Sequence, residues 1–137
     1  NKVPRYDTIG KRLLKIDEKY YLNDHGLRQA QGFSNVRDIE RILENIVYSE
    51  LRSKDYKVYI GKVGDKEIDF IAEKNGKKEY YQVCYALGNE ETREREFRVL
   101  SLAPDNFPKY VLSLDKMNFS HDGIIHMNLV SWLLKDL

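Results

Sequence analysis

The sequence has very little cysteine and no long hydrophobic run, and both absences restrict the kind of protein it can be. One cysteine, Cys84, occurs in 137 residues, so no disulfide can form within the chain and a reducing cytoplasm is expected. No apolar stretch approaches the roughly 20 residues of a membrane span, and the start shows no signal-peptide pattern. We therefore expect a cytoplasmic protein without a membrane partner.

Several catalytic motifs are absent as well. The chain contains neither G-x-x-x-x-G-K-[ST] nor G-x-G-x-x-G, so it has no recognisable loop for nucleotide phosphates and ATP binding is not expected of it. His25, His121 and His126 are scattered, and none has cysteine or acidic neighbours at zinc spacing. No serine or cysteine nucleophile motif is found.

The charges are nearly balanced but unevenly spread. The net charge is +1, from 23 Lys and Arg against 22 Asp and Glu. Residues 1–35 carry 7 basic and 4 acidic side chains, whereas residues 36–137 carry 16 and 18. A globally basic surface for nucleic acid is therefore absent, and such a partner would have to bind a local patch.

The hydrophobic pattern predicts an α/β sandwich built on a mixed sheet. Residues 1–34 are predicted to form an N-terminal segment of short extended pieces, and residues 35–137 the α/β domain. A stripe at helical spacing, which includes Leu43 and Val47, predicts a helix from Val36 to Ser53. The later elements are a three-strand antiparallel meander (56–62, 67–73, 78–86), a helix (89–102), a strand parallel to the third (110–114), a short strand (124–127) and a closing helix anchored by Trp132 (129–137). Helices are expected on both sides of the sheet.

The Asn75-Gly76 pair fixes the most specific part of this prediction. Asn-Gly between two strands favours a two-residue turn, because both residues accept the positive φ of a type I′ turn. Counting back from this turn places Asp69 opposite Gln82, with Cys84 on the same face. We expect the amide of Gln82 to donate to the carboxylate of Asp69.

This cluster is the best candidate for chemistry. Asp69 and Gln82, helped by Glu44 or Glu50 from the helix, could form an oxygen site for Mg²⁺ or Mn²⁺. Glu50 is more simply explained by a salt bridge or by reaching solvent at the last helical turn. Cys84 cannot supply the positive charge that phosphodiester hydrolysis needs, and it is more simply a small core residue.

Two further groups of residues suggest contact with nucleic acid. Arg93, Arg95 and Arg98 could touch phosphate, although residues 90–98 read mainly as a solvated helix face. The tyrosines around position 80 could stack on bases, but aromatic residues are also ordinary in strands.

At these residues the sequence resembles the PD-(D/E)XK nuclease superfamily, and more closely the C-terminal restriction-endonuclease-like domain of prokaryotic AAA-type ATPases, a domain of unknown function. The similar segments are Lys19 to Leu27, Leu43 to Tyr48, Glu67 to Ala72, Gln82 to Cys84 and Thr92 to Glu96. They extend over nearly the whole chain. The resemblance implies a restriction-endonuclease-like fold, and it makes residues 1–34 the end of a preceding winged-helix region.

The resemblance also implies roles for individual residues. Glu44, Asp69 and Gln82 occupy the acidic and glutamine positions, with the backbone carbonyl of Val83 as a further metal ligand. Cys84 stands where active nucleases have lysine. The family implies an N-terminal ATPase domain of the parent chain as partner, with DNA as a second partner. We therefore expect a catalytically degenerate nucleic-acid-binding or regulatory module. The alternatives are a metal-dependent DNA nuclease, in which Lys77 or Lys78 replaces the missing lysine, and a protein-interaction domain.

Overall fold

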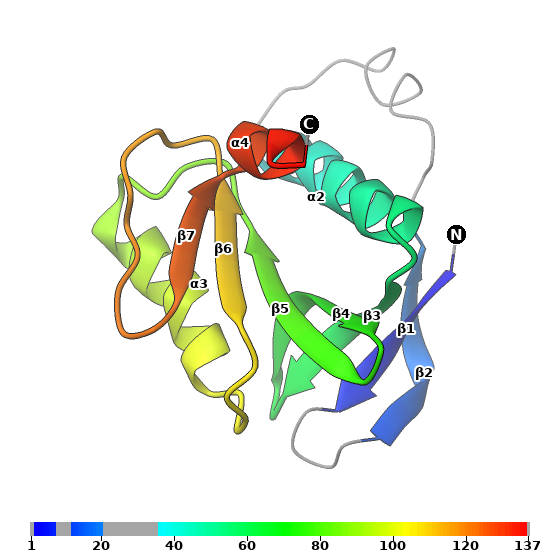
Figure 1. The fold of residues 1–137 in the computed structure, drawn as a ribbon. Helices are drawn as coiled ribbons and strands as arrows, with labels where there is room; N and C mark the ends of the chain where they lie inside the picture. The colour runs from blue at the N-terminus through cyan, green and yellow to red at the C-terminus, as the bar shows by residue number, and fades with distance from the viewer. Residues whose placement is uncertain (1, 8–11, 21–35, 137) are drawn as a thin grey trace.

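The computed structural model describes residues 2–7, 12–20 and 36–136, which form a seven-stranded mixed sheet with helices packed on it (Figure 1). Neighbouring strands follow the order β2-β1-β3-β4-β5-β6-β7. The strands are β1 (Lys2–Asp7), β2 (Arg12–Tyr20), β3 (Lys57–Val63), β4 (Lys66–Lys74), β5 (Lys77–Val83), β6 (Lys109–Ser113) and β7 (Ile125–Asn128).

The centre of the sheet matches the predicted topology. Strands β3, β4 and β5 form an antiparallel meander, and β6 lies parallel to β5. Strand β7 then lies parallel to β6. The parallel pairing of β5 and β6 follows from the helix between them, which carries the chain back to the end of the sheet where β5 began. The mixed α/β architecture expected from the sequence is confirmed.

The N-terminal strands extend the same sheet. Strand β1 pairs in parallel with β3, β2 pairs antiparallel with β1, and the side chain of Val3 is fully buried in the core. Residues 2–7 and 12–20 are thus strands of this sheet. The assignment of residues 1–34 to a winged-helix region stays a prediction. Residues 21–35, which include His25 and most of the Lys19–Leu27 segment, lie outside the described residues.

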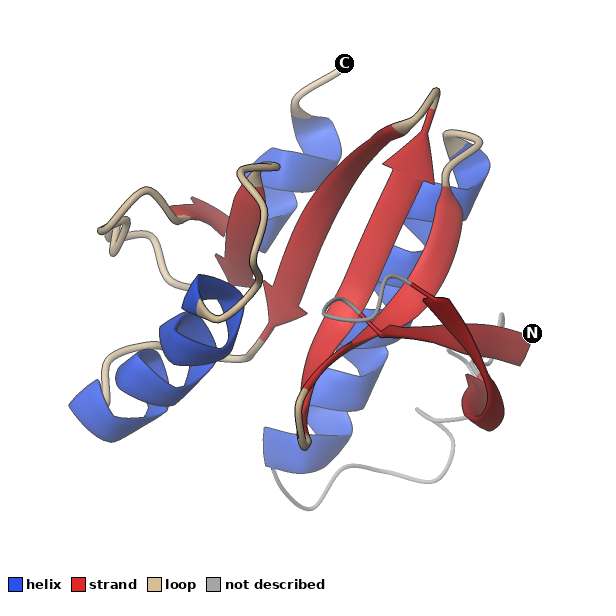
Figure 2. Cartoon of the chain, turned by 90° about the horizontal axis from the view of Figure 1, so that it is seen from below, coloured by secondary structure: helices blue, strands red, loops and turns tan. Residues whose placement is uncertain are grey.

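Helix α2 (Val36–Ser53) has the bounds that the sequence predicts. It buries Leu43, Val47 and Leu51 against one face of the sheet, each worth about 1.5–3 kcal/mol of burial. Figure 2 shows α2 lying behind the central strands. Helix α4 (Leu129–Leu134) packs in the same core, with Trp132 buried as predicted.

Helix α3 (Glu90–Ser101) belongs to a second core on the other face of the sheet. The side chain of Asn89 caps it by accepting the backbone N–H of Thr92 at 3.1 Å. Phe97 and Leu100 are buried in this core. The sheet therefore separates two apolar layers, and any polar site must lie where neither layer closes over it.

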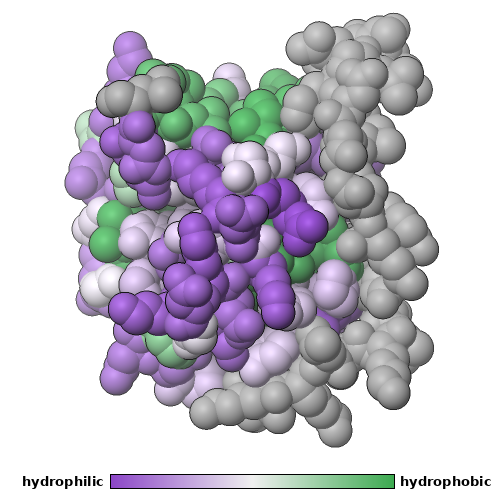
Figure 3. All heavy atoms as spheres, turned by 45° about the vertical axis from the view of Figure 1, so that its right-hand side comes forward, coloured by the Kyte–Doolittle hydropathy of each residue, from purple (hydrophilic) through white to green (hydrophobic). Residues whose placement is uncertain are grey.

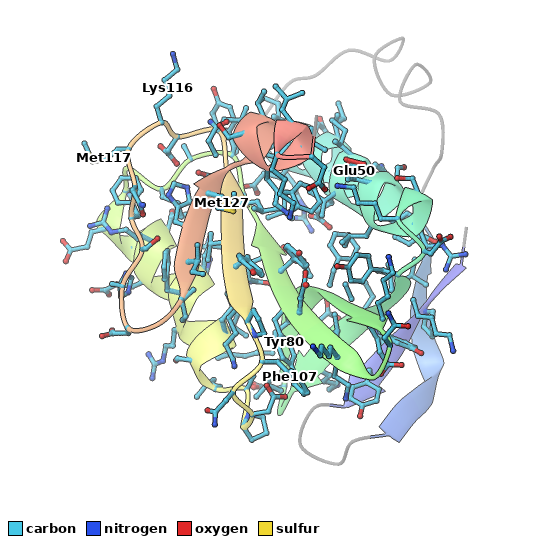
Figure 4. All side chains as sticks on the ribbon, viewed as in Figure 1. Glu50, Tyr80, Phe107, Lys116, Met117 and Met127 are labelled. Atoms are coloured by element: carbon cyan, nitrogen blue, oxygen red, sulfur yellow. The ribbon has the colours of Figure 1, made fainter. Side chains whose placement is uncertain are left out.

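Glu50 lies in the last turns of α2, where Figure 4 labels it. The hydroxyl of Ser53 donates to its Oε1 at 3.3 Å, and its charge is one of those that raise the pKa of Lys54, after the larger effect of Asp136. Glu50 thus contacts Ser53 at the last turn of α2, and the expected salt bridge or contact with solvent stays a prediction. None of the helices among the described residues is long and apolar enough to cross a lipid bilayer.

Candidate functional site

The turn between β4 and β5 has the two-residue form that the sequence predicts. Asn75 and Gly76 adopt φ values of 55° and 77°, as a type I′ turn requires. The paired residues run from Lys74–Lys77 to Phe70–Tyr81, so their numbers always sum to 151. The predicted register is confirmed over this stretch.

Beyond that stretch, side chains take over the hydrogen bonds between the two strands. The side-chain oxygen of Gln82 accepts the backbone N–H of Asp69 at 2.6 Å. In return, Oδ2 of Asp69 accepts the backbone N–H of Val83 at 2.8 Å. A register shift on the other side of β4, opposite Ile60, accompanies this change. Asp69 and Gln82 are therefore direct neighbours.

The expected bond from the Gln82 amide to the Asp69 carboxylate is wrong in its detail. The amide of Gln82 donates instead to Oε2 of Glu96 in α3, at 2.8 Å. The carboxylate of Asp69 is already occupied by the N–H of Val83, and the Gln82 side chain is turned so that its oxygen faces the backbone. Gln82 thus links β4, β5 and α3 in one polar contact.

Glu96 is one site residue that sequence reasoning missed. Its side chain is 13% exposed, and burial raises its pKa to about 7 against the opposing effect of Arg95, whose Nη2 lies 3.9 Å away. The charges of Glu40 and Glu44 raise the pKa further. The signal was present: Glu96 precedes Phe97 and lies four residues before Leu100, so it sits on the apolar side of α3.

Helix α2 brings two more carboxylates toward this site. Oε2 of Glu40 accepts the backbone N–H of Tyr85, just after β5, at 2.9 Å. Glu44, a predicted site residue, lies near enough to Glu96 to affect its pKa. Glu40 was not singled out from the sequence, although it falls on the same helical face as Leu43 and Val47.

Cys84 is a buried core residue and not a reactive thiol. It is fully buried in the core under α3. Burial is the main cause that raises its pKa, followed by the charges of Glu96, Glu40 and Asp69. The position therefore carries no charge at neutral pH and is surrounded by groups of negative charge.

Asp69 and Gln82 face a groove of about 510 Å³ beside α3. Three cations and five carboxylates line it. The cations are Lys66, Arg95 and Arg98, and the carboxylates are Glu67, Asp69, Glu91, Glu94 and Glu96. Three minus five leaves a formal charge of −2 when all are ionised, which opposes the binding of phosphate.

The predicted arginines of α3 separate into two kinds. Arg95 and Arg98 line the groove. Arg93 instead donates from Nη1 to the carbonyl of Leu87 at 2.9 Å and lies 5.0 Å from the ring centre of Phe119. It supports the loop between β5 and α3, so its guanidinium is already engaged in a structural role.

Metal binding at the predicted ligands stays a prediction. Over residues 2–7, 12–20 and 36–136, no group of three or more His, Cys, Asp or Glu side chains is placed to hold a metal ion. The amide of Gln82 and one oxygen of Asp69 are committed to protein partners, and Val83 contributes its N–H to Asp69. A cation would have to use the remaining oxygens, including the Val83 carbonyl.

The lysines considered as replacements lie at the far end of β5. Lys78 Nζ contacts the hydroxyl of Tyr6 at 2.9 Å, and Lys77 is paired with Lys74 beside the turn. Lys78 precedes Gln82 by four residues, or about 13 Å along a strand. Neither lysine takes the place of a cation at Asp69.

A second polar cluster joins Ser113, His126 and Asp115, but it is not arranged as a hydrolase triad. Ser113 Oγ lies 2.8 Å from His126 Nε2 and donates to Asp115 at 2.7 Å. His126 Nδ1 accepts the N–H of Phe119 at 3.1 Å, so in the neutral ring Nε2 carries the proton. His126 therefore donates to the serine and cannot remove its proton.

The comparisons with known proteins give a relative without a stated function. The chain is 36% identical over 135 residues to an uncharacterized protein of Haemophilus influenzae, strain Rd. The match includes 98% of this chain but only 33% of that protein. The chain thus spans about a third of the length of the relative it matches. No protein-family model matches the chain.

Proposed function

We propose that this chain is a nuclease-like domain of a larger protein, that it has lost phosphodiester cleavage, and that it serves as a nucleic-acid-binding or regulatory module. The observation that carries the proposal is Cys84. At the position where the resembling nucleases have lysine, this chain has a buried, uncharged thiol near several carboxylates. This thiol cannot offset the negative charge that develops on a phosphate during hydrolysis.

The hydrogen bonds of the neighbouring residues support the same proposal. Asp69 and Gln82 hold β4, β5 and α3 together through bonds of 2.6–2.8 Å. A metal ion at Asp69 would compete with the N–H of Val83 for the carboxylate. The polar cluster is thus suited to a structural role, which a domain retains after its chemistry is lost.

The length of the relative supports the assignment to a larger protein. It is about three times as long as the matching region, as expected if further domains accompany this one. The resemblance to the C-terminal domain of prokaryotic AAA-type ATPases makes an ATPase domain of the parent chain the proposed partner. Under this proposal the domain binds nucleic acid or regulates the ATPase, and does not cut DNA.

The test is a cleavage assay with labelled duplex and single-stranded DNA in Mg²⁺ or Mn²⁺. We expect no cleavage by the 137-residue chain, and salt-sensitive binding without cleavage. The matched variant is Asp69→Asn, which keeps an oxygen for the N–H of Val83. Metal-dependent cleavage that disappears in this variant would establish a working nuclease instead. A chain that neither cleaves nor binds DNA would support a protein-interaction domain.

A further inference from the structure

The end of the sheet at the β4–β5 turn carries an excess of lysine. Four lysines lie there: Lys74 and Lys77 beside the turn on the α2 face of the sheet, and Lys57 and Lys78 on the α3 face. We call this group, with Glu73 and Glu79, the hairpin end. Lys74 is paired directly with Lys77, and Glu73 is paired with both Lys57 and Lys78. Four lysines against two glutamates give a charge of +2.

These lysines are not neutralised by carboxylates. Among the residues that the structure describes, none of the four forms a salt bridge. Lys74 donates to the backbone carbonyl of Lys54 at 2.8 Å, and Lys78 contacts the hydroxyl of Tyr6 at 2.9 Å. Lys57 and Lys77 are exposed. The exposed amines of Lys57, Lys74 and Lys77 thus keep their charge available to a partner, whereas Lys78 is half-buried against Tyr6.

The nearby carboxylate of Glu79 is hydrogen-bonded to tyrosines. It accepts the hydroxyls of Tyr56 and Tyr81 and so lies in the polar contacts between those rings. The Tyr56 ring also supports Lys74, whose Nζ lies 5.3 Å from its centre. Figure 3 shows mostly hydrophilic residues across the middle of the face that it presents.

This arrangement has a cost that the fold itself does not explain. Like charges placed directly opposite each other in a sheet are destabilising, by up to about 1 kcal/mol, as for Lys74 and Lys77. Lysines often protect an edge strand from pairing with another chain. That explanation does not apply, because β4 and β5 lie in the middle of the strand order.

We propose that the hairpin end is the surface that binds the phosphodiester backbone of nucleic acid. The inference rests on the proposed function, and it assigns the contact to the turn instead of to the arginines of α3. The hairpin end has a charge of +2, whereas the groove beside α3 has −2. Lysine is a strongly hydrated point charge, suited to phosphate but without the planar fork that reads bases. Binding is therefore independent of sequence and strongly dependent on salt.

The test measures binding of labelled 20-mer duplex and single-stranded DNA to the 137-residue chain by fluorescence anisotropy, at several salt concentrations. Two double variants with the same charge change are compared: Lys74→Gln/Lys77→Gln and Arg95→Gln/Arg98→Gln. The lysine variant is expected to lose affinity by at least about tenfold at 50 mM salt, and its slope of log K against log salt should fall by about 2. The arginine variant should match the wild type.

A single control, Lys116→Gln, separates the hairpin end from a general charge effect. Lys116 projects from the loop after β6, at the end of the molecule away from the β4–β5 turn (Figure 4). This variant should bind as the wild type does. Thermal melting of every variant checks that the fold is kept, which is expected because Lys74, Lys77 and Lys116 are exposed.

The outcomes distinguish this inference from the proposed function. If the arginine variant loses binding and the lysine variant binds fully, the assignment of DNA binding to the hairpin end is overturned. The proposal that the domain binds nucleic acid is then kept. Absence of any DNA binding by the wild type overturns this inference and the nucleic-acid-binding form of the proposed function, and leaves its regulatory form. Binding to phosphatidylserine vesicles without binding to DNA would assign the lysines to a lipid surface and overturn the inference in that way.

Discussion

The side-chain oxygen of Gln82 accepts the backbone N–H of Asp69 at 2.6 Å, just beyond the paired stretch of β4 and β5. A side chain therefore supplies the acceptor for that N–H. The same glutamine donates to Glu96, so one residue satisfies groups on two different elements. Gln82 therefore joins β4 and α3 through a single side chain.

Replacing Gln82 with leucine should destabilise the fold by about 1 to 3 kcal/mol, because the N–H of Asp69 and the carboxylate of Glu96 each lose a buried partner. Urea unfolding measures the change. Asn106→Leu is the matched control at an exposed amide and should leave the free energy of unfolding nearly unchanged. Equal stability of the two variants would contradict the bridging role.

Glu96 should make the wild type lose stability as the pH rises from about 4.5 to 7. Its pKa is raised to about 7 by burial, so the folded state holds a proton that the unfolded state releases in this range. Glu96→Gln removes this loss. The free energy of unfolding of the variant, relative to that of the wild type, should therefore rise by at most about 3 kcal/mol between about pH 4.5 and 7. Urea unfolding at several pH values measures the difference.

The control for Glu96 is Glu94→Gln on the same helix. Glu94 is exposed, and its variant should follow the pH dependence of the wild type. If Glu96→Gln and the wild type differ by the same amount at pH 5 and pH 8, the buried carboxyl does not titrate as expected.

His126 should make the protein lose stability as the pH falls, which is the opposite of the effect of Glu96. Burial lowers its pKa below the ordinary 6.5, although the charge of Asp115 opposes this, so the unfolded state binds the proton more readily. Its contribution to stability is complete above pH 6.5 and is lost as the pH falls below that value. In urea unfolding, His126→Gln should lose less stability at acid pH than the wild type does. His121→Gln should show the same loss as the wild type. An unchanged acid profile in His126→Gln would be evidence against the prediction.

Gly61→Ala should destabilise the sheet by about 1 to 3 kcal/mol through overpacking. A Cβ at this position would lie 2.8 Å from Cβ of Ile68 and 3.1 Å from the side chain of Ile71. Gly88→Ala is the control, since a Cβ there meets nothing within 4 Å. Thermal unfolding compares the two, and similar melting temperatures would show that β3 and β4 can move apart.

The sequence determined the elements that depend on local pattern. Helical periodicity predicted α2 from Val36 to Ser53, because one apolar face must be buried. Asn75-Gly76 predicted the turn and its register, because only certain residues accept positive φ. Neighbouring strands then follow from short-range pairing, which is why Asp69 and Gln82 could be placed together before the fold was known.

Only the tertiary structure decided which groups complete the site. Glu96 belongs to α3, Glu40 to α2 and Gln82 to β5, and no spacing in the sequence states that these elements meet. The direction of the Gln82 side chain and the burial of Glu96 depend on how α3 packs over the sheet. A pKa near 7 for that carboxyl arises because packing removes it from water, and desolvation is a property of the folded surroundings that local sequence does not contain.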